Sequence, residues 1–147
     1  GDPGAKRLAR SMDIPVIGIA AAAAREAALS GVSFAVVTST PKLAPSIDKI
    51  MRAERGDTYL GCYTTEDDPL VLASNSDALD YALITSCEIA KKAGAKRVII
   101  GGGPLGQAAI RISSQVKVPL IQPLVAACSE VSALIEHQLP HVQDVGR

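Results

Sequence analysis

Aromatic side chains and excess charge are both lacking in this sequence. Its 147 residues contain no Trp, one Phe and three Tyr, and its 15 basic side chains are balanced by 15 acidic ones. A net charge of zero supplies no positive field for a phosphate backbone, and so few rings offer little on which bases could stack. No apolar stretch approaches the roughly 20 residues that span a bilayer. We therefore expect neither a nucleic acid nor a membrane as a partner.

Cysteine is also scarce, and its pattern argues against two common uses. Cys62, Cys87 and Cys128 are odd in number and widely spaced, and no two of them form a C-x-x-C pair. This pattern disfavours a disulfide framework and a zinc site, and it fits a protein of the reducing cytoplasm. We expect all three thiols to have structural roles.

Two groups of metal-ligand residue types lack the spacing of a metal site. His137 and His141 stand four residues apart, but Pro140 interrupts the helix that would bring them onto one ion. The acidic residues 66–68 are consecutive, whereas a calcium loop needs a longer set of spaced oxygens. We predict an exposed turn at 66–68 and no metal site.

Apolar, β-branched runs alternate with helical patterns along the chain. Strands are predicted at residues 33–39, 58–65, 96–102 and 118–122, helices at 5–12, 20–30, 41–55, 76–93 and 123–138, and a turn with a helix within 103–116. Residues 66–74 are predicted to be a loop with a short extended piece, and 137–147 a polar tail. This order predicts an α/β fold, a parallel sheet with helices on both faces.

Parallel sheets bind ligands beyond the carboxyl ends of their strands. Thr38–Thr40, Thr64–Thr65 and Gly101–Gly106 follow predicted strands and are the places to search. The GGGPLG loop at Gly101–Gly106 satisfies G-x-G-x-x-G between a strand and a helix, the pattern of a dinucleotide site. That site also needs an acidic residue at the end of the next strand, where this chain has Gln122. The pattern leaves open a plain turn or an anion site of backbone N–H groups.

The VVTSTP segment at residues 36–41 is a second candidate. Thr38, Ser39 and Thr40 place three hydroxyls where a strand gives way to a helix, an arrangement that suits a carboxylate or an oxyanion. The alternative is structural, with Thr40 as a helix N-cap and Thr38 satisfied by the backbone. The residues alone do not decide between the two.

Five segments together resemble the aspartate/glutamate/hydantoin racemase superfamily, especially its hydantoin and allantoin racemases. These segments are GDPG at the start, DIPVIGIAAAA (13–23), FAVVTSTPKLAPSI (34–47), AKRVIIGGG (95–103) and KVPLIQPLVAA (117–127). The resemblance implies two similar α/β domains that face each other across a cleft. Residues 32–117 would form the second, nearly complete domain, and residues 1–31 with 118–147 part of the first. We expect the chain to be incomplete at its N-terminus.

The resemblance also implies a cofactor-independent reaction. In this family two cysteines flank the acidic carbon of a small substrate, one removing a proton and the other supplying one to the opposite face. The first cysteine would fall before Gly1, and Gly102 occupies the second cysteine's position. Thr38–Thr40 and Gly101–Gly103 would still bind a carboxylate, hydantoin or allantoin-type substrate.

Without either family cysteine, we predict that this chain is inactive as a racemase. Three alternatives stay open: a one-cysteine decarboxylase or isomerase of the same fold, a non-catalytic carboxylate-binding module, or, less favoured, a dinucleotide-binding domain. Apolar surface left bare by an incomplete first domain predicts a homo-oligomer.

Overall fold

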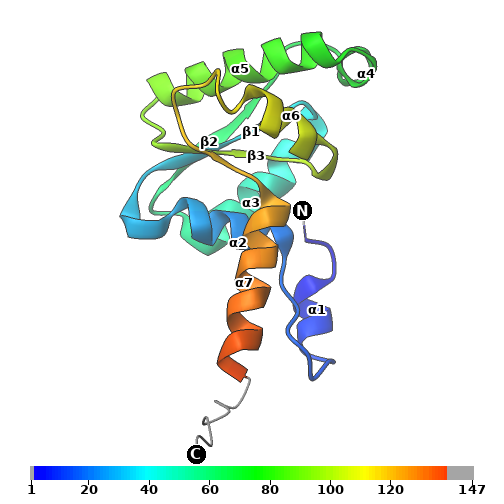
Figure 1. Ribbon diagram of the computed structural model, residues 1–147, viewed down its shortest axis with the longest axis vertical. Helices are drawn as coiled ribbons and strands as arrows, with labels where there is room; N and C mark the ends of the chain where they lie inside the picture. The colour runs from blue at the N-terminus through cyan, green and yellow to red at the C-terminus, as the bar shows by residue number, and fades with distance from the viewer. Residues whose placement is uncertain (1, 139–147) are drawn as a thin grey trace, which may run out of the picture.

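Four parallel strands in the order β2-β1-β3-β4 form the centre of the molecule (Figure 1). The computed structural model describes residues 2–138. The strands are β1 (Phe34–Thr38), β2 (Tyr59–Thr64), β3 (Arg97–Ile100) and β4 (Leu120–Ile121). Strand β1 pairs with β3 from Phe34–Arg97 to Val37–Ile100, and with β2 on its other side. The predicted α/β class with a parallel sheet is confirmed.

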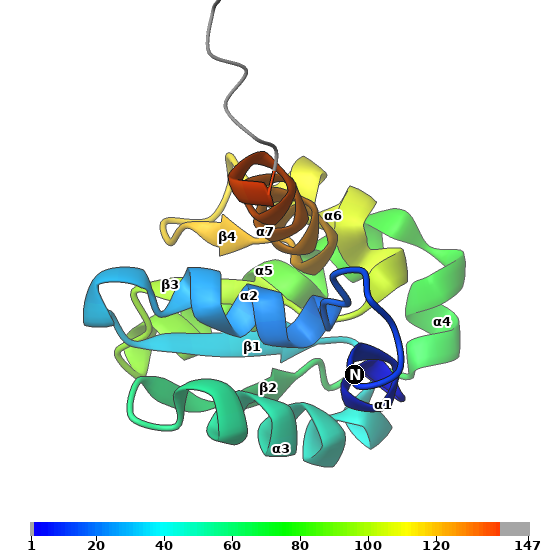
Figure 2. The same cartoon turned by 90° about the horizontal axis from the view of Figure 1, so that it is seen from below.

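The central strands are apolar apart from Thr38 of β1 and Arg97 of β3, because helices cover both of their faces. All five residues of β1 are buried, as are the last three of β3. Helices α5 (Ser76–Lys92) and α6 (Gly106–Ile112) pack on one face, while α2 (Ile19–Ala27), α3 (Ala44–Arg55) and α7 (Pro123–Gln138) cover the other (Figure 2). The prediction of helices on both faces is therefore also confirmed.

Helix α2 contacts α3 on one side and α7 on the other because its buried face is made of alanine. Ala22, Ala23, Ala24 and Ala27 are each at most 1% exposed. Such small side chains let helix backbones approach closely, so three helices fit on one face of a narrow sheet. The helix predicted at 20–30 is shorter: α2 ends at Ala27 with Ala28 as its C-cap. Gly31 has the expected left-handed conformation, with a φ of 68°, but it lies in the 3-10 turn Leu29–Gly31 that follows.

One predicted loop is wrong. Residues 66–74 were expected to be a loop with a short extended piece, but Pro69–Ser74 form helix α4. Asp68 caps this helix, its carboxylate accepting a hydrogen bond from the N–H of Leu70 at 2.7 Å. Pro69 occupies the first helical turn, where its missing N–H costs nothing. The Asp-Pro pair is thus a helix start.

Towards the ends of the chain the structure differs from the prediction in smaller ways. Helix α1 (Ala5–Ala9) is shorter than the predicted 5–12, and residues 14–18 are irregular. The remaining elements within residues 2–138 are three short 3-10 turns: η1 (Leu29–Gly31), η2 (Pro41–Leu43) and η3 (Gly103–Leu105). His137 is exposed at the end of α7, whereas the rest of the predicted tail, with His141, lies outside the described residues.

Strand β4 joins the same sheet, pairing with β3 through Val98–Leu120 and Ile99–Ile121. The sequence assigns this strand, with residues 1–31 and 123–147, to a partial first domain. That division stays a prediction, and residues 32–122 supply all four strands of the sheet. No helix within 2–138 has the length and apolar character needed to cross a bilayer.

Candidate functional site

A cavity of about 680 Å³ lies at the carboxyl end of β3 and β4. Its wall includes the loop Gly101–Gly103 and the first residues of α2, α6 and α7. Side chains from η2 and α3, Leu43 and Ile47, close another side. Open parallel sheets bind ligands in this position, and the cavity is the candidate site.

Uncharged side chains line this cavity. None of its lining residues within 2–138 carries a charge, and its polar side chains are those of Gln107 and Gln122. Large apolar side chains form its rim and are open to solvent: Ile19, Leu43, Ile110, Leu124 and Val125. An ion that entered would lose hydration without gaining an oppositely charged side chain.

The first glycine of the loop packs against β1. The N–H of Gly101 donates to the carbonyl oxygen of Val37 at 2.8 Å. A Cβ at this position would lie 2.8 Å from Cγ1 of Val36, a buried side chain. Only glycine allows this close approach, which sets the depth of the cavity floor.

The next two glycines differ from each other. Gly102 has a φ of 133°, a conformation that residues with a side chain rarely adopt. A Cβ on Gly103 would have no neighbour within 4 Å, and its backbone is outside the left-handed region. Neither N–H donates to a protein oxygen within the described chain, so both are free to bind a ligand oxygen. Gly102, where the family resemblance implies a cysteine, therefore has a backbone conformation that favours glycine.

The threonine segment after β1 turns away from this cavity. Thr38 is 1% exposed, and its hydroxyl accepts the N–H of Thr40 at 3.3 Å. Its carbonyl oxygen accepts the N–H of Thr65, whose own buried hydroxyl has no hydrogen-bond partner among residues 2–138. Thr38, Ser39 and Thr40 do not line the cavity. Thr40 makes no side-chain cap to η2, and a role for these three in binding stays a prediction.

None of the three cysteines lines the cavity either. Burial raises the pKa of Cys62, on β2, to about 12, with Asp48 adding to the effect. Burial also raises the pKa of Cys87, inside α5, to about 12. A thiol with such a pKa stays protonated near neutrality and is a poor base. Cys128 is exposed on α7.

Sequence reasoning missed the two glutamines and the apolar rim. Gln122 entered the sequence analysis only as the residue that fails the acidic test of a dinucleotide site. That failure was itself a signal, because an uncharged amide stood where a carboxylate was required. Gln107 and the rim side chains have no motif, since they meet only when α6 and α7 begin beside the same loop.

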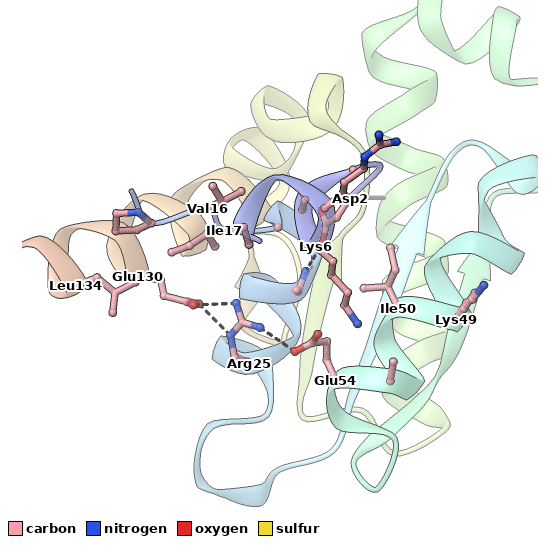
Figure 3. A pocket seen from close by; sticks show the side chains of 18 residues that line it. Asp2, Lys6, Val16, Ile17, Arg25, Lys49, Ile50, Glu54, Glu130 and Leu134 are labelled. Atoms are coloured by element: carbon pink, nitrogen blue, oxygen red, sulfur yellow. Dashed lines mark hydrogen bonds and ion pairs between the residues drawn. The ribbon is translucent and has the colours of Figure 1, made fainter. Parts of the chain in front are cut away.

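A second cavity, of about 710 Å³, lies between α1, α2, α3 and α7 (Figure 3). Charged side chains surround it: Asp2, Lys6, Arg7, Arg25, Lys49, Glu54 and Glu130. Arg25 lies between two carboxylates, 2.7 Å from Glu54 and 2.8 Å from Glu130 (Figure 3). These pairs tie α2 to α3 and α7, so the charges hold helices together.

Asp2 also has a structural use in this second cavity. Its carboxylate accepts hydrogen bonds from the N–H groups of Ala20 at 2.8 Å and Ala21 at 2.9 Å. It thereby occupies the N-terminus of α2, and a Cβ on Gly18 would collide with it. No group of three or more His, Cys, Asp or Glu within 2–138 is placed to hold a metal ion.

A parallel sheet with a glycine loop and a neutral cavity at its carboxyl edge defines the class, an open α/β fold with a cavity in the position where such sheets bind ligands. The sequence profile of the Asp/Glu/Hydantoin racemase family matches residues 1–131. The chain belongs to this family.

Curated relatives include two hydantoin racemases. The protein from Paenarthrobacter aurescens is 26% identical over 138 residues, which are 92% of this chain and 58% of the relative. The protein from Rhizobium meliloti is 27% identical over 136 residues, 91% of this chain and 56% of the relative. The chain therefore spans little more than half the length of the curated relatives it matches.

Solved structures of allantoin racemases have the same fold. The enzyme from Pseudomonas fluorescens superposes with a TM-score of 0.77 at 23% identity, over 90% of this chain and 58% of that one. The enzyme from Klebsiella pneumoniae gives 0.74 at 24% identity, over 85% and 52%. At this identity the likeness supports the fold alone.

Proposed function

We propose that this chain forms one wall of a racemase-type site for a small carbon acid of the hydantoin, allantoin or amino-acid type. Family membership supports the reaction class. The observation that carries the proposal is the Gly101–Gly103 loop, which lines a neutral cavity at the carboxyl end of β3 with two unpaired N–H groups.

The proposed role of this wall is to stabilise an oxyanion. When a carbon acid beside a carbonyl loses its proton, negative charge develops on the carbonyl oxygen. Fixed N–H donors in an uncharged cavity stabilise that charge, because no charged side chain of the wall competes for them. The N–H groups of Gly102 and Gly103 are suited to this role. Proton transfer of this kind requires no cofactor.

The proton carrier is the part that this chain lacks. The resemblance puts one family thiol at Gly102, which has no side chain, and the three cysteines present lie outside the cavity. We propose that the 147-residue chain binds its substrate without racemising it. The test is proton NMR of the purified chain with a 5-substituted hydantoin in deuterium oxide. Loss of the C5 proton signal faster than in a matched buffer blank would overturn the proposal.

A non-catalytic binding protein is the second candidate. It is favoured by the position of the thiols, since Cys87 is buried in one core, Cys62 is partly buried against the other, and both have pKa values near 12. A one-thiol decarboxylase needs a thiol at the site and has no such support within residues 2–138. Saturable substrate binding that persists without proton exchange, even after a thiol is introduced at the loop, would favour the binding protein.

The setting of this function is also a proposal. We propose a cytoplasmic protein that self-associates, because large apolar side chains are exposed away from the cavity, including Leu70 at 81% and Tyr81 at 75%. Sedimentation velocity over a hundredfold range of protein concentration tests the association. A single monomeric species throughout would contradict it.

A further inference from the structure

The segment of residues 5–14, which begins with α1, exposes apolar side chains. No residue of α1 is buried, although its five residues are too few for a helix that is stable in isolation. Leu8 is 49% exposed, Met12 45% and Ile14 62%. None of these three lines the second cavity. Residues 5–14, called the α1 surface below, therefore carry large apolar side chains that the described part of the chain leaves open to solvent.

A second apolar surface lies on α4 and the first turns of α5. Leu70 and Tyr81, already noted as exposed, belong to it together with Val71, which is 59% exposed. Leu72 is buried, so α4 has an inner side against the core and an outer side in solvent. Asp77 and Tyr81 stand four residues apart and therefore share one face of α5. Residues 66–81 are called the α4–α5 surface.

The two surfaces have opposite charges. Residues 5–14 contain three cations and one carboxylate: Lys6, Arg7, Arg10 and Asp13. Residues 66–81 contain five carboxylates and no cation: Glu66, Asp67, Asp68, Asp77 and Asp80. Of all these groups, Asp80 alone forms an ion pair within residues 2–138, with Arg111 at 2.7 Å. Each surface is therefore complementary to the other, and two copies of either one would repel.

Both surfaces lie on the same side of the molecule. Helices α1 and α4 are at the right in Figure 1 and remain at the right in Figure 2, which is turned about the horizontal axis. A two-fold axis on that side can bring the α1 surface of each copy against the α4–α5 surface of the other, so that the same contact forms twice and closes. Together the two surfaces come to the roughly 20–30 residues a side that a stable interface uses.

We propose that two copies of this chain form a two-fold dimer in which the α1 surface of each copy packs on the α4–α5 surface of the other. The inference rests on the self-association proposed above and gives it a surface and a symmetry. Burial of the apolar side chains supplies the affinity, and the charges around them determine which surface meets which. Packing on the partner would also stabilise α1, which is too short to be stable alone.

The first experiment reverses the charge of the α1 surface. An exposed ion pair contributes little by itself, so the variant Arg7→Glu/Arg10→Glu changes two charges and puts like charges at both contacts. In sedimentation velocity of the full chain it should weaken the dimer about tenfold or more. Lys96→Glu/Lys117→Glu is the matched control, because these exposed cations precede β3 and β4 at the opposite edge of the sheet. It should leave the dimer Kd within about twofold of wild type.

The second experiment reverses the α4–α5 surface with Glu66→Lys/Asp67→Lys/Asp77→Lys. This variant keeps the Asp68 cap and the Asp80 ion pair, and it too should weaken the dimer about tenfold or more. An equimolar mixture of the two charge-reversed variants has opposite charges at both contacts, so it should restore a dimer of nearly wild-type affinity. Circular dichroism of each variant should show wild-type helix content.

The apolar contribution is tested without a change of charge. Leu8→Ser and Leu70→Ser remove one exposed leucine from each surface, and each should weaken the dimer about fivefold or more. Leu29→Ser is the matched control, since Leu29 is exposed on η1, outside both surfaces. It should leave the dimer Kd within about twofold of wild type.

The outcomes separate this inference from the proposals on which it rests. If wild type associates but the charge-reversed and leucine variants associate equally well, or the mixture is no tighter than either variant alone, the assigned surfaces are wrong. Species that grow beyond a dimer with concentration would contradict the two-fold symmetry. If wild type is a monomer throughout, the self-association is wrong and the inference fails with it. Substrate binding, measured separately, decides the proposed site.

Discussion

The two cavities are nearly equal in volume, about 680 and 710 Å³, but their walls differ completely in charge. In the second cavity Arg25 is paired twice and Asp2 caps α2, so these charges are satisfied by the protein. Lys6, Arg7 and Lys49 of the same wall form no ion pair within residues 2–138. The neutral cavity keeps two amides and two backbone N–H groups unpaired within residues 2–138. Charge in a wall is therefore a poor guide to a ligand site when it is paired. Unused hydrogen-bonding capacity is the better guide.

Gly101→Ala should cause the largest loss of stability and should disrupt the wall of the neutral cavity. The new Cβ would lie 2.8 Å from Cγ1 of Val36, a buried β-branched side chain whose stiff χ1 limits how far it can move. We expect a loss of about 3 kcal/mol in the free energy of unfolding, the upper end for overpacking, measured by urea denaturation. Gly103→Ala is the matched control, since its Cβ would meet nothing within 4 Å. Equal stabilities for the two variants would contradict the close packing at Gly101.

Arg25→Ala should disrupt the wall of the second cavity and cause a smaller loss of stability. It leaves the half-buried carboxylates of Glu54 and Glu130 without their partner. We expect a loss of about 2 kcal/mol in the free energy of unfolding, less than for fully buried pairs because all three side chains are partly solvated. Arg10→Ala, at an exposed position, should change stability by less than about 0.5 kcal/mol. A loss for Arg25→Ala no greater than for Arg10→Ala would mean that the cluster does not hold these helices together.

A thiol placed in the neutral cavity tests whether its wall lacks only a proton carrier. Gly102→Cys imposes a side chain on a φ of 133° and should cost about 1–2 kcal/mol of stability. Gly103→Cys carries no such strain and should be close to wild type. Urea denaturation measures the difference, and proton NMR in deuterium oxide measures exchange at C5 of a bound hydantoin. Gained exchange with Gly103→Cys would support a racemase wall that lacks only its proton carrier, whereas no gain would favour the binding protein.

We expect the smallest effect in the pH dependence of stability, from the buried thiol of Cys87. The folded-state pKa of Cys87 is raised from the usual 9.0 to about 12, so the unfolded chain loses this proton first as pH rises. The stabilising contribution is complete below pH 9 and is lost between pH 9 and 12. We expect a loss of about 1 kcal/mol from Cys87 at pH 10. Urea denaturation at pH 8 and pH 10 should therefore give a smaller difference for Cys87→Ala than for wild type.

Much of the fold could be predicted because its signals are local. Strand β1 is apolar at its first four positions since both of its faces are buried, and Gly31 adopts a left-handed φ in the turn that follows α2. Helix α4 was missed although its signal was also local: the Asp68 cap and Pro69 outweigh the extended look of the residues that follow.

The site was harder to predict because its parts converge only in space. The glycine loop has a motif and lies in the cavity as the pattern suggested. The hydroxyl of Thr38 was a plausible ligand contact in sequence, but it bonds to the nearby N–H of Thr40. Gln107 lies on α6, before β4 in the chain, and Gln122 lies between β4 and α7, and no spacing rule connects them. The place of the loop at the sheet edge followed from a local motif, whereas the residues that other elements bring beside it had no motif.

The conformation of Gly102 also bears on how this lineage could change. A backbone that rests at a φ of 133° makes cysteine at 102 a poor first mutation, because the loop would be destabilised before any proton carrier was correctly placed. A cysteine at Gly103 meets no such obstacle. A thiol could therefore be acquired more easily at position 103, with the reacting group displaced by one residue from position 102.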